Sequence, residues 1–206
     1  MMARIGLGDK NTGGGNCYTK STYIYCAEKL RNIRRKTMIK WAYILIGDDY
    51  TGKTTFQKEL IRFVAFNRYQ HLDCNLTFDI RIRIGNNNIK TISLMNRSFQ
   101  EKEYQSVPDF FSSHFKEADA CILSSHLVQP DIEQMIGELK KRFYNVCGVF
   151  FENSVNANKP ANEVIALLDW DEKYWIENPI TGDEKSWRDI IQNGAMEFGN
   201  HLLCKI

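Results

Sequence analysis

Eight consecutive residues combine glycines, a lysine and a hydroxyl residue at a spacing suited to phosphate chemistry. They are Gly47, Asp48, Asp49, Tyr50, Thr51, Gly52, Lys53 and Thr54, here called the glycine loop. Glycines let a backbone wrap closely around a phosphate and donate its N–H groups to the oxygens. A lysine at this spacing neutralises the β and γ phosphates, and the next hydroxyl is a ligand for Mg²⁺. The spacing therefore predicts that residues 47–55, Thr55 included, bind the Mg²⁺ complex of ATP or GTP, with Thr54 on the metal.

A buried strand and an amphipathic helix are predicted on either side of the glycine loop. Residues 41–46 are nearly all apolar, as in a parallel strand that is covered on both faces. Phe56, Leu60 and Val64 recur at helical spacing, so a helix is expected to begin near Lys53. The N-terminus of that helix would point at the phosphates, where its dipole and its free N–H groups favour an anion.

The rest of the chain alternates between predicted strands and helices. Residues 76–84 and 89–95 flank a run of turn residues and predict a hairpin. Further strands are expected at 118–123, 146–151 and 174–176, and helices at 108–116, 131–143, 162–168 and 186–203. In the last helix the side chains expected to face inward are those of Trp187, Ile190, Ile191, Ala195 and Phe198. This order predicts a three-layer α/β fold with a mostly parallel sheet, one antiparallel edge hairpin and ligands at the carboxyl ends of the strands.

Charge is unevenly distributed along the 206 residues. The whole chain has a net charge of +2, whereas residues 1–39 hold eight Lys or Arg against two acids, which is a net +6 and leaves −4 for residues 40–206. We interpret 1–39 as a basic N-terminal extension, with a helix expected over 21–35, and 40–206 as a nucleotide-binding domain. A basic helix can contact nucleic acid or an anionic membrane surface, but a solvated extension is the favoured interpretation.

The cysteines and the hydropathy indicate where the protein resides. Six scattered cysteines form no CxxC pair, and two lie in apolar runs, which is typical of reduced thiols in a cytoplasmic protein. No stretch has the length and apolarity of a membrane span, and the N-terminus lacks the apolar core of a secretory signal. We therefore expect a soluble, cytoplasmic protein.

From about Lys40 to the C-terminus the order of elements resembles the small GTPases of the Ras and Rab type, within the P-loop NTPase superfamily. The glycine loop matches their Walker A motif, and residues 80–101 can be laid along their hairpin and second switch without a gap. Gln100 and Glu101 then stand where that family has its Gln-Glu pair. The resemblance implies that Gln100 positions the water that attacks the γ phosphate, while Lys53 stabilises charge on the transferred group.

Three departures from that family pattern bear on turnover and on the base. Asn96 stands where the family has an Asp that supports Mg²⁺, and Phe99 where it has a Gly whose amide meets the γ phosphate. Residues 151–155 lack the Asp that discriminates guanine. These changes leave adenine and guanine both open, and they favour slow hydrolysis, or a nucleotide-binding assembly module with a protein partner and no turnover, over an efficient switch.

A second resemblance is to the thymidylate kinases. It rests on the residues Gly47, Asp49, Gly52, Lys53, Thr54 and Thr55. It implies transfer of the γ phosphate to a nucleoside monophosphate with Asp49 near the acceptor. The Asp-Arg pair and the arginine-bearing lid of those kinases are not clear in the sequence.

Polar residues also stand at the ends of two other predicted strands. Ser124, Ser125 and His126 could approach the γ phosphate, but satisfied hydroxyls and a histidine in solvent are the favoured interpretation. Glu152 could hold Mg²⁺ through water, although an ordinary loop acid is favoured there.

Overall fold

The computed structural model describes residues 39–206 except 67–76, 86–87, 102–103, 154–158 and 179–183. Of the predicted basic extension it describes only Ile39, so the helix expected over 21–35 lies outside the described residues.

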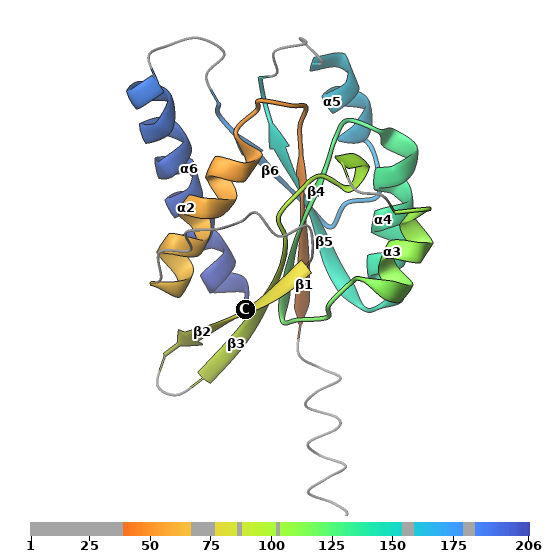
Figure 1. Cartoon of the computed structure of the whole chain (residues 1–206), viewed down its shortest axis with the longest axis horizontal. Coiled ribbons are helices and arrows are strands. Elements are labelled where there is room, and N and C mark those ends of the chain that lie inside the picture. The colour runs from red at the N-terminus through yellow and green to blue at the C-terminus, as the bar shows by residue number, and fades with distance from the viewer. Residues whose placement is uncertain (1–38, 67–76, 86–87, 102–103, 154–158, 179–183) are drawn as a thin grey trace, which may run out of the picture. The chain divides into compact units, whose positions relative to one another are not determined.

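One six-stranded sheet runs through the described part of the chain, in the order β2-β3-β4-β1-β5-β6 (Figure 1). The strands are β1 (Lys40–Ile46), β2 (Thr77–Ile84), β3 (Asn88–Met95), β4 (Ala120–Ser125), β5 (Tyr144–Phe151) and β6 (Glu172–Ile176). Only the edge pair β2 and β3 is antiparallel, and the other neighbours are parallel. The prediction of an α/β fold with a mostly parallel sheet and one antiparallel edge hairpin is confirmed.

The strand order determines which segments reach the end of β1. Tyr43 of β1 lies opposite Ile122 of β4 on one side and Cys147 of β5 on the other. β4 thus separates β1 from β3, and the hairpin does not pair with the strand that leads into the glycine loop. Because β1, β3 and β4 run parallel, the residues that follow them meet at the same edge of the sheet.

Helices cover both faces of this sheet (Figure 1). They are α2 (Lys53–Ala65), the 3₁₀ turn η1 (Phe99–Glu101), α3 (Val107–Ser113), α4 (Gln129–Lys141), α5 (Lys159–Ile165) and α6 (Glu184–Lys205). Tyr43 and Leu45 pack in the core beneath α2 and α6, whereas Ala42, Ile44 and Ile46 pack in the core on the side of α3, α4 and α5. Alternate side chains of β1 enter different cores, which explains why the strand is apolar at every position.

Local residues determine where α3 and α4 begin. α3 begins after Ser106, whose hydroxyl accepts a hydrogen bond from the backbone N–H of Asp109 at 3.2 Å. Pro108 lies in its first turn, where a missing N–H costs nothing. α4 likewise has Pro130 in its first turn. The predicted helices at 108–116 and 131–143 are therefore present; α3 begins one residue and ends three residues before its prediction, and α4 begins and ends two residues before its own.

One inward-facing prediction for α6 is wrong. The side chain of Ile190 is 38% exposed, whereas Ile191, Ala195 and Phe198 are fully buried. These three residues follow the spacing of one helix face, and successive residues of a helix are rotated by about 100°, so Ile190 lies beside that face. In the described residues no helix has the length and apolarity needed to cross a bilayer.

Candidate functional site

The glycine loop follows β1 and is held against the end of β4. The N–H of Gly47 donates to the carbonyl of Ser125 at 3.3 Å, and the hydroxyl of Thr51 donates to the carbonyl of Asp48 at 2.9 Å. Tyr50 and Gly52 adopt left-handed backbone conformations, with φ of 60° and 92°. The loop therefore turns sharply before α2 begins.

Both glycines of the loop are required by their surroundings. A Cβ atom added at Gly52 would lie 3.0 Å from the Trp187 ring, in a conformation that strains any L side chain. A Cβ added at Gly47 would lie 2.8 Å from the Thr51 hydroxyl. The glycine spacing in the sequence thus corresponds to two places where a side chain does not fit.

Asn178 connects the glycine loop to the end of β6, a contact that no sequence pattern predicts. Its side-chain N–H₂ donates to the carbonyls of Thr51, at 3.2 Å, and of Asn153, at 2.6 Å. Its side-chain oxygen accepts from the backbone N–H of Asn153 at 2.8 Å. Nothing about an isolated asparagine after a short strand distinguishes it from a turn residue, so only the fold reveals the contact.

Lys53 is buried at the start of α2, with its side chain directed back onto the glycine loop. Its ammonium group donates to the carbonyls of Gly47 and, at 2.7 Å, of Asp48, and the residue is 8% exposed. Burial lowers the pKa of Lys53 to about 8, although the nearby carboxylates of Glu101, Asp49 and Asp48 act to raise it. The charge of Lys53 is therefore incompletely compensated by the groups around it.

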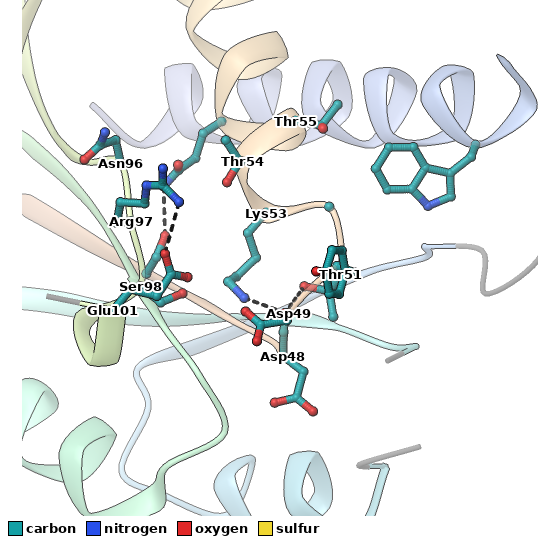
Figure 2. A pocket seen from close by; sticks show the side chains of 15 residues that line it. Asp48, Asp49, Thr51, Lys53, Thr54, Thr55, Asn96, Arg97, Ser98 and Glu101 are labelled. Carbon is teal, nitrogen blue, oxygen red and sulfur yellow. Dashed lines mark hydrogen bonds and ion pairs between the residues drawn. The ribbon is translucent and has the colours of Figure 1, made fainter. Parts of the chain in front are cut away.

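A cavity of about 580 Å³ opens beside the ammonium group of Lys53 (Figure 2). We call it the loop cavity. Its lining residues are Asp48, Asp49, Tyr50, Thr51, Gly52, Lys53, Thr54, Thr55, Gln57, Asn96, Arg97, Ser98, Glu101, Ser124 and Trp187. Every residue that the sequence predicted for nucleotide binding lines it except Gly47, which forms the base of the loop.

Buried polar groups from α2, β4 and the turn after β3 form one wall of the loop cavity. The side-chain N–H₂ of Gln57 donates to the carbonyl of Met95 at 2.9 Å and to the hydroxyl of Ser124 at 2.8 Å. The side-chain oxygen of Gln57 and the hydroxyl of Ser98 are buried and have no hydrogen-bond partner among the described residues. Buried polar atoms usually have partners, so these two call for a ligand or ordered water.

Gln100 and Glu101 differ in their relation to the loop cavity. The amide N–H₂ of Gln100 donates to the hydroxyl of Ser125 at 3.1 Å and to the carboxylate of Asp131 at 2.8 Å, and its oxygen accepts from the N–H of His126 at 2.8 Å. Gln100 does not line the loop cavity, whereas Glu101 does. Gln100 would have to give up these bonds to perform the predicted positioning of water.

Glu101 also belongs to a cluster with Asp49 and His126. The Nε2 atom of His126 lies 3.1 Å from Glu101 Oε1 and 3.7 Å from Asp49 Oδ1, while Arg97 lies 3.4 Å from Glu101 Oε2. Burial opposes ionisation of Glu101, but the hydrogen bond from His126 and the charges of His126 and Arg97 together hold the pKa of Glu101 below its usual value. The favoured interpretation of His126 as a histidine in solvent is wrong, because its side chain is only 18% exposed.

The other polar residues at strand ends lie as the favoured interpretations expected. Ser124 and Ser125 are buried, and both hydroxyls have partners: Ser124 accepts from Gln57, and Ser125 donates to the carbonyl of His126 at 2.8 Å. Glu152 is exposed and lines a different cavity, of about 450 Å³, together with Asn162 and Trp175.

No protein-family model matches the chain, and no curated protein is significantly similar to it in sequence.

Proposed function

We propose that this protein binds a nucleoside triphosphate, as its Mg²⁺ complex, in the loop cavity. The buried ammonium group of Lys53 is the observation that carries the proposal. Keeping a lysine charged at 8% exposure costs free energy, as its pKa of about 8 reflects. A polyphosphate in the glycine loop would supply the compensating negative charge, and the charge-assisted hydrogen bonds would be strong.

The start of α2 supports an anion at this place. Gly52, at the N-cap position, offers no side chain to accept from the first N–H groups, and the first turn of α2 contains no acidic residue. These N–H groups and the helix dipole are consequently available to phosphate oxygens. Thr54 lines the loop cavity with an exposed side chain, as a metal-ligating hydroxyl would require.

The size of the loop cavity also supports the proposal. Its volume of about 580 Å³ lies within the roughly 300–1,000 Å³ typical of small-molecule sites. We propose ATP or GTP as the nucleotide, because residues 151–155 lack the Asp that would restrict the site to guanine.

The proposed turnover is slow hydrolysis. Asp48, Asp49 and Glu101 all line the loop cavity, and carboxylates repel the phosphates unless cations lie between them. Gln100, the predicted water-positioning residue, is engaged elsewhere. A site that has phosphate ligands but no side-chain amide aimed at the attacking water is expected to hydrolyse its bound nucleotide slowly.

Lys53→Met tests binding, with Lys58→Met as its matched control. Lys58 is an exposed lysine on the same helix, so its replacement removes one positive charge without touching the loop cavity. Lys53→Met should weaken binding of fluorescent ATP or GTP about tenfold to a hundredfold, the worth of a hydrogen bond between charged groups. Lys58→Met should bind like the wild type. Equal affinity in Lys53→Met and wild type would refute the proposal.

Radiolabelled ATP and GTP, with and without a panel of nucleoside monophosphates, test the turnover. The expected result is slow release of inorganic phosphate that does not depend on the added monophosphate. Label appearing in a nucleoside diphosphate formed from an added monophosphate would instead establish a nucleotide kinase.

A further inference from the structure

We propose that Asp49, Glu101 and His126 form a binding site for a first-row divalent transition-metal ion such as Mn²⁺. The site lies at the edge of the loop cavity and is distinct from the Mg²⁺ position expected at Thr54. It does not depend on the proposed nucleotide binding.

The ligand atoms of the three side chains already lie close together. One atom from each, His126 Nε2 and one oxygen each of Asp49 and Glu101, falls within 4.8 Å of the others. The separations from Nε2 are 3.1 Å and 3.7 Å, and ligands bound at about 2.1 Å to one ion lie roughly 3.0–3.4 Å apart. Asp49 is the most exposed of the three, with a side chain 62% exposed, and can close the remaining distance by rotation.

Three separate segments bring these side chains together. Asp49 lies in the glycine loop after β1, Glu101 lies in η1 beyond β3, and His126 is the residue that follows β4. Gln100 holds two of these segments to each other, because its oxygen accepts from the His126 N–H at 2.8 Å. The sheet edge thus fixes the backbone positions of Glu101 and His126, and the exposed Asp49 side chain completes the cluster by rotation.

The hydroxyl of Ser98 gives a second, independent indication of a ligand. Ser98 is 2% exposed, lines the same cavity as Glu101, and its hydroxyl has no hydrogen-bond partner among the described residues. Ser98 and Glu101 belong to one turn, in which the Glu101 N–H donates to the Ser98 carbonyl at 3.0 Å, and Figure 2 shows their side chains next to each other. The oxygen itself is sealed from solvent, so a water bound to the ion would meet it after rotation of the Ser98 side chain.

Charge in the loop cavity also favours a cation there. With His126 neutral, as ligation to a metal requires, the carboxylates of Asp48, Asp49 and Glu101 face two cationic side chains, Lys53 and Arg97. Arg97 pairs with the Oε2 atom of Glu101, and the Oε1 atom is the one that approaches His126. A divalent ion on Oε1 would therefore leave the Arg97 pair intact while it offsets the repulsion between Glu101 and Asp49.

The ligand types define the class of metal. Two carboxylates and an imidazole suit Mn²⁺, Co²⁺ or Zn²⁺, whereas Mg²⁺ prefers oxygen ligands and retains its waters. Mn²⁺ is the best probe, because the six cysteines of the chain would compete for softer ions.

The test measures Mn²⁺ binding to the full chain by electron paramagnetic resonance, without nucleotide and with excess Mg²⁺. One equivalent should bind, and Asp49→Asn, Glu101→Gln and His126→Asn should each weaken binding at least about tenfold. Asp49→Asn alters an exposed side chain, so folding is not at risk. His114→Gln is the control, since the His114 ring packs at a tilt against Tyr104 and His114 lines neither the loop cavity nor the cluster. The proposed site would be refuted if the wild type did not bind Mn²⁺, or if all four variants bound it with the same affinity.

Lys53→Met separates this inference from the proposed function. It should bind nucleotide about tenfold to a hundredfold more weakly and yet bind Mn²⁺ at least as well as the wild type, because it removes a nearby cation. Mn²⁺ binding that appears only with nucleotide would refute a metal site built by these three side chains. Retained Mn²⁺ binding in a protein that binds no nucleotide would support the metal site and refute the proposed function.

Discussion

Lys53 is the residue on which the candidate site depends, and its chemistry differs from that of a surface lysine. Its pKa of about 8 means that its charge is lost within an accessible range of pH. A lysine chosen only for stability would lie in solvent or beside a carboxylate that balances it. The cost of burying Lys53 is thus more easily explained by a negatively charged ligand than by the fold.

Nucleotide affinity is predicted to fall as pH rises above about 8. A triphosphate binds the protonated form of Lys53, and the free protein loses that proton around its pKa of about 8. The association constant should therefore be nearly constant from pH 7 to 7.5 and decline by up to about tenfold per pH unit above pH 8. Titration calorimetry at several pH values measures this. Residual nucleotide binding in Lys53→Met should not decline with pH in this way. A decline in both proteins would mean that a group other than Lys53 causes it.

At the scale of elements, the junction of the glycine loop with α2 depends on α6. Trp187 and Ile191 of α6 lie where a side chain on Gly52 would project. The helix that presents its N–H groups to the loop cavity is therefore seated directly on the closing helix, and a change at Gly52 should be felt by both.

Gly52→Ala is predicted to destabilise the protein by about 1–3 kcal/mol, from the left-handed conformation and the crowding by Trp187 and Ile191. Nucleotide affinity should fall as well, because the first turn of α2 must shift. Gly137→Ala in α4 is the control: an added Cβ meets nothing within 4 Å there, so this helix should gain roughly 0.5–1 kcal/mol. Urea denaturation measures both, and a stable Gly52→Ala would mean that the loop relaxes freely.

The sequence allowed most elements to be predicted, but not their order in the sheet. The runs at 41–46 and 146–151 were recognisable because strands buried on both faces are apolar throughout. The insertion of β4 between β1 and β3 depends on side-chain packing between distant segments, which periodicity does not record. For the same reason the glycine loop was predictable as a local motif, whereas the cluster of Asp49, Glu101 and His126 was not.

At the scale of the whole molecule, the loop cavity lies where the carboxyl ends of the central strands meet the first turn of α2. The strands beneath it are fully buried, with Ile44, Leu45 and Ile46 inaccessible to solvent. This buried base carries Lys53, whose charge is costly to keep in the folded protein. Stability and ligand binding are therefore expected to respond in opposite directions to changes at Lys53.

The global stability of the protein is predicted to depend on pH through Lys53. Lys53 has a pKa of about 8 in the folded protein and its ordinary value of 10.5 when unfolded. Between these pH values the unfolded chain binds more protons than the folded chain, so the contribution of Lys53 makes the free energy of unfolding increase as pH rises. Below pH 8 the full cost of keeping Lys53 charged in the folded protein remains. Relative to Lys53→Met, the wild type should therefore gain about 1–3 kcal/mol between pH 7.5 and 10. Denaturation of both proteins at each pH cancels the contribution of other titrating groups. A difference that stays constant over this range would mean that Lys53 titrates normally, and its burial would then give no support to a bound phosphate.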